Sequence, residues 1–142
     1  MGYKKISLKE AAGFHGHLGP YLVLGILAGE FALKTLKAKK YFGITIKVWG
    51  ANKKPKSCLV DGLQLSSGAT YGKGNIEKYP GDKIKAEFCN FKTRAKCVLQ
   101  LEGGLIQKLK QTRTHRDSEI LAKKIYKSNY SDLFYLTLNP EP

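Results

Sequence analysis

The sequence is poor in cysteine, in acidic residues and in long apolar runs, and each shortage excludes a class of protein. Its cysteines, Cys58, Cys89 and Cys97, are odd in number and form no C-x-x-C pair, which argues against a disulfide framework and a complete zinc finger. The apolar run from Tyr21 to Phe31 is interrupted by Glu30 and falls short of the roughly 20 residues that a membrane span requires. We therefore expect no membrane-spanning segment.

The first residues lack the apolar core and the small-residue cleavage site of a signal peptide, so we expect a cytoplasmic protein. The composition, 42% hydrophobic and 25% charged, is typical of a soluble globular protein. No repeat, low-complexity block or linker divides the chain. We expect residues 1–142 to form a single domain.

The shortage of acids leaves a formal net charge of +14, from 25 Lys and Arg against 11 Asp and Glu. Such a charge attracts nucleic acid, anionic cofactors or acidic proteins. Solvated lysine surfaces and thermal adaptation produce the same composition. No RNA-binding aromatic motif, zinc finger or helix-turn-helix accompanies the charge, so both interpretations stay open.

Hydrophobic periodicity predicts an α+β fold, in which helices pack on one face of a small mixed or antiparallel sheet. A buried central helix is expected at about 20–39, begun by Pro20, with Gly25 and Gly29 leaving a flat strip for close backbone approach. The other expected elements are helices at 7–12, 58–65, 103–110 and 115–127, strands at 43–50, 83–91, 96–101 and 133–138, and an irregular segment at 66–75.

The most informative motif is the pair His15 and His17 in a glycine-rich turn before the central helix. In an extended turn, residues two apart point the same way, so both imidazoles can face one cavity. There they can bind a metal or transfer protons. A zinc site needs a further ligand, and Cys58 or Asp61 is the best source. Alternatively, one ring caps a backbone carbonyl and the other is exposed.

Cys58 and Asp61 lie three residues apart, on one face of a short helix that Ser57 is expected to cap. A helix N-terminus stabilises a thiolate, which favours metal ligation or nucleophilic reactivity at Cys58. The alternative is a buried thiol beside an aspartate that accepts local backbone hydrogen bonds.

The irregular segment is rich in glycine but is not a phosphate-binding P-loop. Only three residues separate Gly68 from the Gly72-Lys73 pair, where that motif has four, and a further glycine follows the lysine. The segment can still form an anion or cofactor loop from backbone amides and polar side chains, or simply a turn against the central helix. The candidate loop residues are Thr70, Gly72, Lys73, Gly74 and Asn75.

Together, F-H-G-H-L-G-P-Y-L-V-L-G at 14–25 and C-L-V-D-G-L-Q-L-S-S-G-A-T-Y-G-K-G-N-I at 58–76 resemble the FmdE-like family, named for the FmdE component of formylmethanofuran dehydrogenase. The resemblance implies an α+β core, commonly dimeric, in which His15, His17 and Cys58 converge as metal ligands with Asp61 behind them. Two departures stand out. Many members have Cys-Pro-Gly where this chain has Gly19-Pro20-Tyr21, and many carry a C-terminal zinc ribbon that this sequence lacks.

The resemblance predicts a metal-binding or redox-associated protein linked to molybdenum or tungsten formylmethanofuran dehydrogenase metabolism. Zinc is the favoured metal, because the ligands are imidazole, thiol and carboxylate. A homodimer is expected, together with an anionic or pterin-type ligand. An enzymatic role is left open. The alternatives are a basic module that binds nucleic acid or an acidic protein without catalysis, and a purely structural component of a homodimer.

Overall fold

The fold comes from a computed structural model, which describes residues 5–140. It contains six helices and one five-stranded sheet within that range. In chain order the elements are α1 (Leu8–His15), α2 (Pro20–Leu36), β1 (Ile44–Trp49), α3 (Cys58–Ser67), β2 (Ile76–Tyr79), β3 (Lys85–Asn90), β4 (Lys96–Leu101), α4 (Gly103–Gln111), α5 (His115–Tyr126), α6 (Tyr130–Leu133) and β5 (Phe134–Leu138). The predicted α+β class is confirmed.

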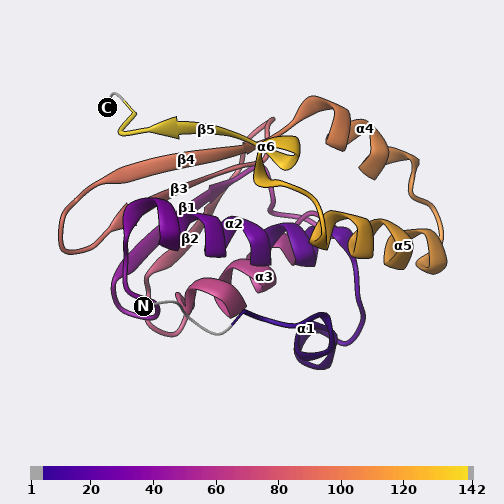
Figure 1. Cartoon of the computed structure of the whole chain (residues 1–142), viewed down its shortest axis with the longest axis horizontal. Helices are drawn as coiled ribbons and strands as arrows, with labels where there is room; N and C mark the ends of the chain where they lie inside the picture. The colour runs from indigo at the N-terminus through magenta and orange to yellow at the C-terminus, as the bar shows by residue number, and fades with distance from the viewer. Residues whose placement is uncertain (1–4, 141–142) are drawn as a thin grey trace.

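The sheet has the strand order β2-β1-β3-β4-β5, with β1 and β2 parallel and every other neighbouring pair antiparallel. Alternate residues of the strands face the core. Ile44, Ile46 and Val48 of β1 are buried, whereas Lys47 between them is exposed. Because this alternation buries one face only, the helices gather on that face. Figure 1 shows α2 and α3 crossing the sheet, with α4 and α5 beyond one end of it.

Helix α2 is the centre of the molecule. Pro20 occupies its first turn, and the residues from Leu22 to Gly29 are all buried, as predicted. Its expected end at residue 39 is wrong: the helix stops at Leu36 because Lys37 adopts a left-handed conformation with φ of 50°. No single helix of residues 5–140 is long and apolar enough to cross a membrane. The pair α1 and α2 has enough length and apolar character only across a 120° bend.

Helices α2 and α3 touch at their backbones, and glycines make this possible. A Cβ added to Gly25 would lie 2.1 Å from the carbonyl oxygen of Leu59, and one added to Gly62 would lie 2.1 Å from that of Leu22. Real Cβ atoms essentially never approach this closely. The crossing therefore fixes α3, and the side chains near its N-terminus, against the central helix without intervening side chains.

Several boundaries differ from those that the sequence predicts. Helix α1 extends to His15, because the Ser7–Glu10 capping box starts it and Gly16, with φ of 104°, ends it. Ser66 and Ser67 belong to α3 rather than to the irregular segment, and their hydroxyls bond back to the carbonyls of Gly62 and Leu63. Strand β2 and the single turn α6 are additional elements that sequence patterning missed.

The remaining sequence expectations have mixed outcomes. Cys89 and Cys97 are buried, as small apolar residues of the sheet. Ser57 precedes α3, but its side chain makes no capping hydrogen bond, so that prediction is wrong. The signal-peptide argument depends partly on residues 1–4, which lie outside the described residues.

Candidate functional site

The best-defined polar contact of the predicted site joins His15 to Asp61. His15 is the last residue of α1, Asp61 lies in the first turn of α3, and their Nδ1 and Oδ2 atoms are 2.7 Å apart. The His15 side chain is 11% exposed and that of Asp61 is 39% exposed. Because a carboxylate only accepts hydrogen bonds, Nδ1 carries the proton and Nε2 of the neutral ring keeps its lone pair. This contact fixes the tautomer of His15.

His17 lies against His15, although not for the reason that the sequence suggests. The two ring centroids are 5.1 Å apart with planes inclined at 59°. An extended turn is excluded, because His15 is helical and Gly16 takes a left-handed conformation between the two rings. The left-handed glycine reverses the chain after α1, and this reversal leaves the imidazoles adjacent. The predicted proximity is confirmed, and the expected local geometry is wrong.

The third histidine of the chain joins the other two. His115, the first residue of α5, places its ring 5.5 Å from that of His17, with the planes nearly perpendicular at 87°. Sequence reasoning did not single it out, since it stands within a basic segment almost 100 positions away. Its only signal in the sequence is its identity, because the chain has three histidines.

Cys58 is the first residue of α3 and is half-buried. Burial raises the pKa of its thiol, the negative charge of Asp61 raises it further, and Lys54 partly offsets both. This direction is opposite to the one that a helix N-terminus alone would produce. Cys58 is therefore a protonated thiol at neutral pH, and a metal would have to displace that proton.

Metal ligation by His15, His17 and Cys58 stays a prediction. Within residues 5–140, no three His, Cys, Asp or Glu side chains already stand in a metal-binding arrangement. The fixed tautomer of His15 and the exposure of His17 are compatible with ligation after ring rotation. The missing family cysteine has room here: a Cβ at Gly19 would lie 3.4 Å from Cε1 of His17.

The polar side chains of the glycine-rich loop are held within the fold. Asn75 accepts a hydrogen bond from the backbone of Thr70 and donates to the carbonyls of Tyr41 and Ile44. The ammonium of Lys73 bonds to the carbonyl of Gly68, at the C-terminus of α3. These contacts account for the loop as a connection between α3 and β2. An anion-binding role for it stays a prediction.

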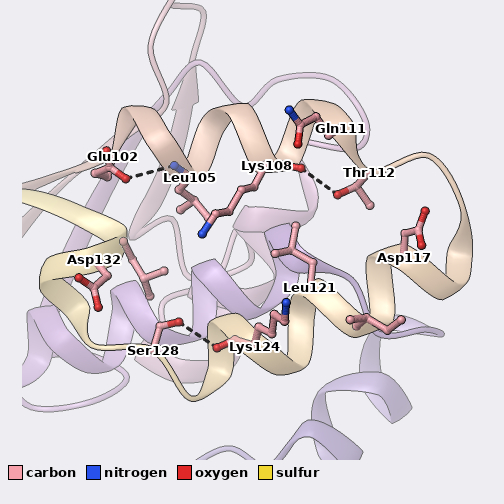
Figure 2. Close-up of a pocket in the computed structure, with 12 residues that line it drawn as sticks. Glu102, Leu105, Lys108, Gln111, Thr112, Asp117, Leu121, Lys124, Ser128 and Asp132 are labelled. Carbon is pink, nitrogen blue, oxygen red and sulfur yellow. Dashed lines mark hydrogen bonds between the residues drawn. The ribbon is translucent and has the colours of Figure 1, made fainter.

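A separate groove of about 400 Å³ runs between α4 and α5. Leu105 and Leu121 supply apolar walls, and Figure 2 shows Lys108 and Lys124 extending into the space between the two helices. Glu102 lies at one end, where its carboxylate caps α4. None of the predicted site residues is among the described residues that line this groove.

Comparisons with known proteins agree with this fold. The family model described as "FmdE, Molybdenum formylmethanofuran dehydrogenase operon" matches residues 14–135. A crystal structure of an FmdE-like protein of tungsten formylmethanofuran dehydrogenase from Syntrophus aciditrophicus superposes with a TM-score of 0.65 at 20% identity, covering 100% of this chain and 78% of that one. No functionally curated protein matches the sequence.

Proposed function

The chain belongs to the FmdE family, and from this premise we propose that it is a zinc-binding accessory protein of formylmethanofuran dehydrogenase-type metabolism. His15, His17 and Cys58 hold the metal in this proposal, and Asp61 orients His15. The observation that carries it is the 2.7 Å contact between His15 and Asp61, beside a second imidazole 5.1 Å away.

The contact between His15 and Asp61 supports metal binding through its chemistry. Ligating histidines almost always donate their other ring N–H to a carboxylate or carbonyl, which fixes the ring and raises the basicity of the ligating nitrogen. Here Asp61 takes Nδ1 and leaves Nε2 for a metal. Imidazole with one thiol is a ligand set that suits zinc. Bound zinc supplies a Lewis acid to any further ligand.

The remaining site groups determine how such a metal is held. Cys58 binds as a thiolate, so its raised pKa makes metal binding release a proton and weaken as the pH falls. The net charge of +14 supports an anionic small molecule or an acidic protein as the second partner.

Elemental analysis of protein purified without chelators tests the proposal. We expect one zinc per chain in the wild type and its loss in His17→Ala and Cys58→Ser. Asp61→Asn should weaken zinc binding about 10- to 100-fold. Asp132→Asn, a matched change on the exposed turn α6, should leave zinc binding unchanged.

A thermal shift gives a second readout. At free zinc about 100 times Kd, binding to the folded state alone contributes about 2.7 kcal/mol of stability, which raises Tm by roughly 5–10 °C for a chain of this size. Wild-type protein that contains no stoichiometric zinc and shows no such rise refutes the metal-binding function.

A further inference from the structure

The three histidines of the chain form one continuous row of rings, although they come from two distant parts of the sequence. His17 stands in the middle, 5.1 Å from His15 and 5.5 Å from His115. His115 belongs to α5, whereas the other two flank the turn between α1 and α2. No motif of the first half of the chain requires an imidazole at this position of α5.

These spacings match those of imidazoles that share one ion. Zinc binds imidazole nitrogen at about 2.0–2.1 Å in tetrahedral geometry, so two ring centroids on one ion lie about 5 Å apart. The two observed separations are close to this value, and the rings are inclined at 59° and 87° rather than stacked. Inclined rings can direct their edge nitrogens to a common point, whereas stacked rings cannot.

The surroundings of His115 hold its backbone and leave its ring free. The Thr114 side chain accepts a hydrogen bond from the backbone of Asp117 and thus fixes the first turn of α5. Ala122 and Ile125, buried farther along the helix, anchor α5 in the core. His17 and His115 are both exposed, so rotation of their side chains is not blocked by packing.

We propose that His115 is a further ligand of the metal site, so that His15, His17 and His115 bind one divalent cation and tie α5 to the turn between α1 and α2. This proposal rests on the proposed function, since it concerns the same cation, and adds a ligand from the second half of the chain. The rings of His17 and His115 turn their nitrogens inward on binding, because no three ligands are already arranged for a metal within residues 5–140.

The neighbouring charges do not prevent this arrangement. Arg113 and Arg116 flank His115 and repel a cation, but both are exposed, so water and salt screen the repulsion. Asp117 lies in the same first turn and offsets part of it. Direct coordination by nitrogen is the stronger effect at such short range.

Zinc titration against a chromophoric chelator tests the assignment. We expect His115→Ala to weaken zinc binding by more than about 100-fold, since loss of a ligand exceeds the 10- to 100-fold effect of an outer partner. Arg116→Ala, the adjacent exposed residue, serves as the matched control and should bind as the wild type does. Far-UV circular dichroism checks that both variants are folded.

Hydrogen exchange provides a readout that a general loss of affinity does not. Zinc should slow amide exchange in the first turns of α5 in the wild type, and in His115→Ala even saturating zinc should leave that exchange unchanged. Cobalt(II) spectra give a further test, because replacement of one imidazole changes the ligand-field bands.

The two proposals fail in different ways. If His17→Ala loses zinc while His115→Ala binds as tightly as the wild type, the assignment of His115 is overturned and the metal site stands without it. If the wild type binds no zinc, the proposed function fails and the ligand assignment fails with it.

Discussion

The crossing of α2 and α3 predicts that Gly25→Ala destabilises the protein, although alanine is the better helix former. The added Cβ would lie 2.1 Å from the Leu59 carbonyl oxygen and 2.8 Å from the Leu63 nitrogen. These are backbone atoms on a buried helix, so no side-chain rotation relieves the clash. The helices must separate by roughly 1 Å to restore ordinary contact distances.

The expected magnitude follows from two opposing effects. Overpacking a tight core costs about 1–3 kcal/mol, and a clash between two backbones belongs at the upper end of that range. Replacing an interior helix glycine by alanine returns about 1 kcal/mol through helix propensity. We therefore expect a net loss of about 2 kcal/mol in the free energy of unfolding, or roughly 4–8 °C in Tm.

Urea denaturation measures this loss, with Gly13→Ala as the matched control. Gly13 lies within α1, and a Cβ there meets nothing within 4 Å. The control should gain about 0.5–1 kcal/mol, because only the propensity effect remains. If Gly25→Ala were as stable as the wild type or more so, the close contact between α2 and α3 would be refuted.

Three further predictions concern single side chains. Alkylation of Cys58 should be slow at neutral pH and faster in Asp61→Asn, because burial and that negative charge both raise the thiol pKa; rates measured against pH check this. Hydrogen bonds from the amides of α4 lower the pKa of Glu102, so Glu102→Ala should reduce stability at neutral pH, and its deficit should vanish as the pH falls through the lowered pKa, in urea titrations at several pH values. Gly19→Cys should tighten zinc binding, because the added side chain lies beside His17; an unchanged affinity contradicts this.

Short-range signals in the sequence predict most of the fold. The Ser7–Glu10 capping box and Pro20 are local devices, and both operate in the structure as the sequence indicates. The alternation along β3 and β4 likewise reflects one buried face. Each of these features depends on residues within a few positions of one another, so the pattern carries the information.

The elements that the sequence does not reveal depend on distant partners. Strand β2 has only four residues, two of them the exposed Glu77 and Lys78, so its sequence shows no sustained alternation. It is a strand because it pairs in parallel with β1, about 30 positions earlier. Such pairing is a property of the assembled sheet.

The site shows the same division. Two separate motifs indicate that His15 and Asp61 belong together, and the structure confirms the contact. The position of His115 beside His17 depends on how α5 packs on α2, which no motif encodes. The thiol of Cys58 shows that burial and a neighbouring charge can outweigh a helix terminus, and neither is visible in a short sequence window.

The paired glycines of the α2–α3 crossing also limit how this chain can change during evolution. A Cβ at either Gly25 or Gly62 would lie 2.9 Å from the Cα of the other, and each would strike the opposite backbone. A second substitution therefore cannot rescue the first, since no side chain is present to be made smaller. Asp61 is the immediate neighbour of Gly62, so drift at this crossing displaces the partner of His15. Selection on packing and selection on the site act here on the same few backbone atoms.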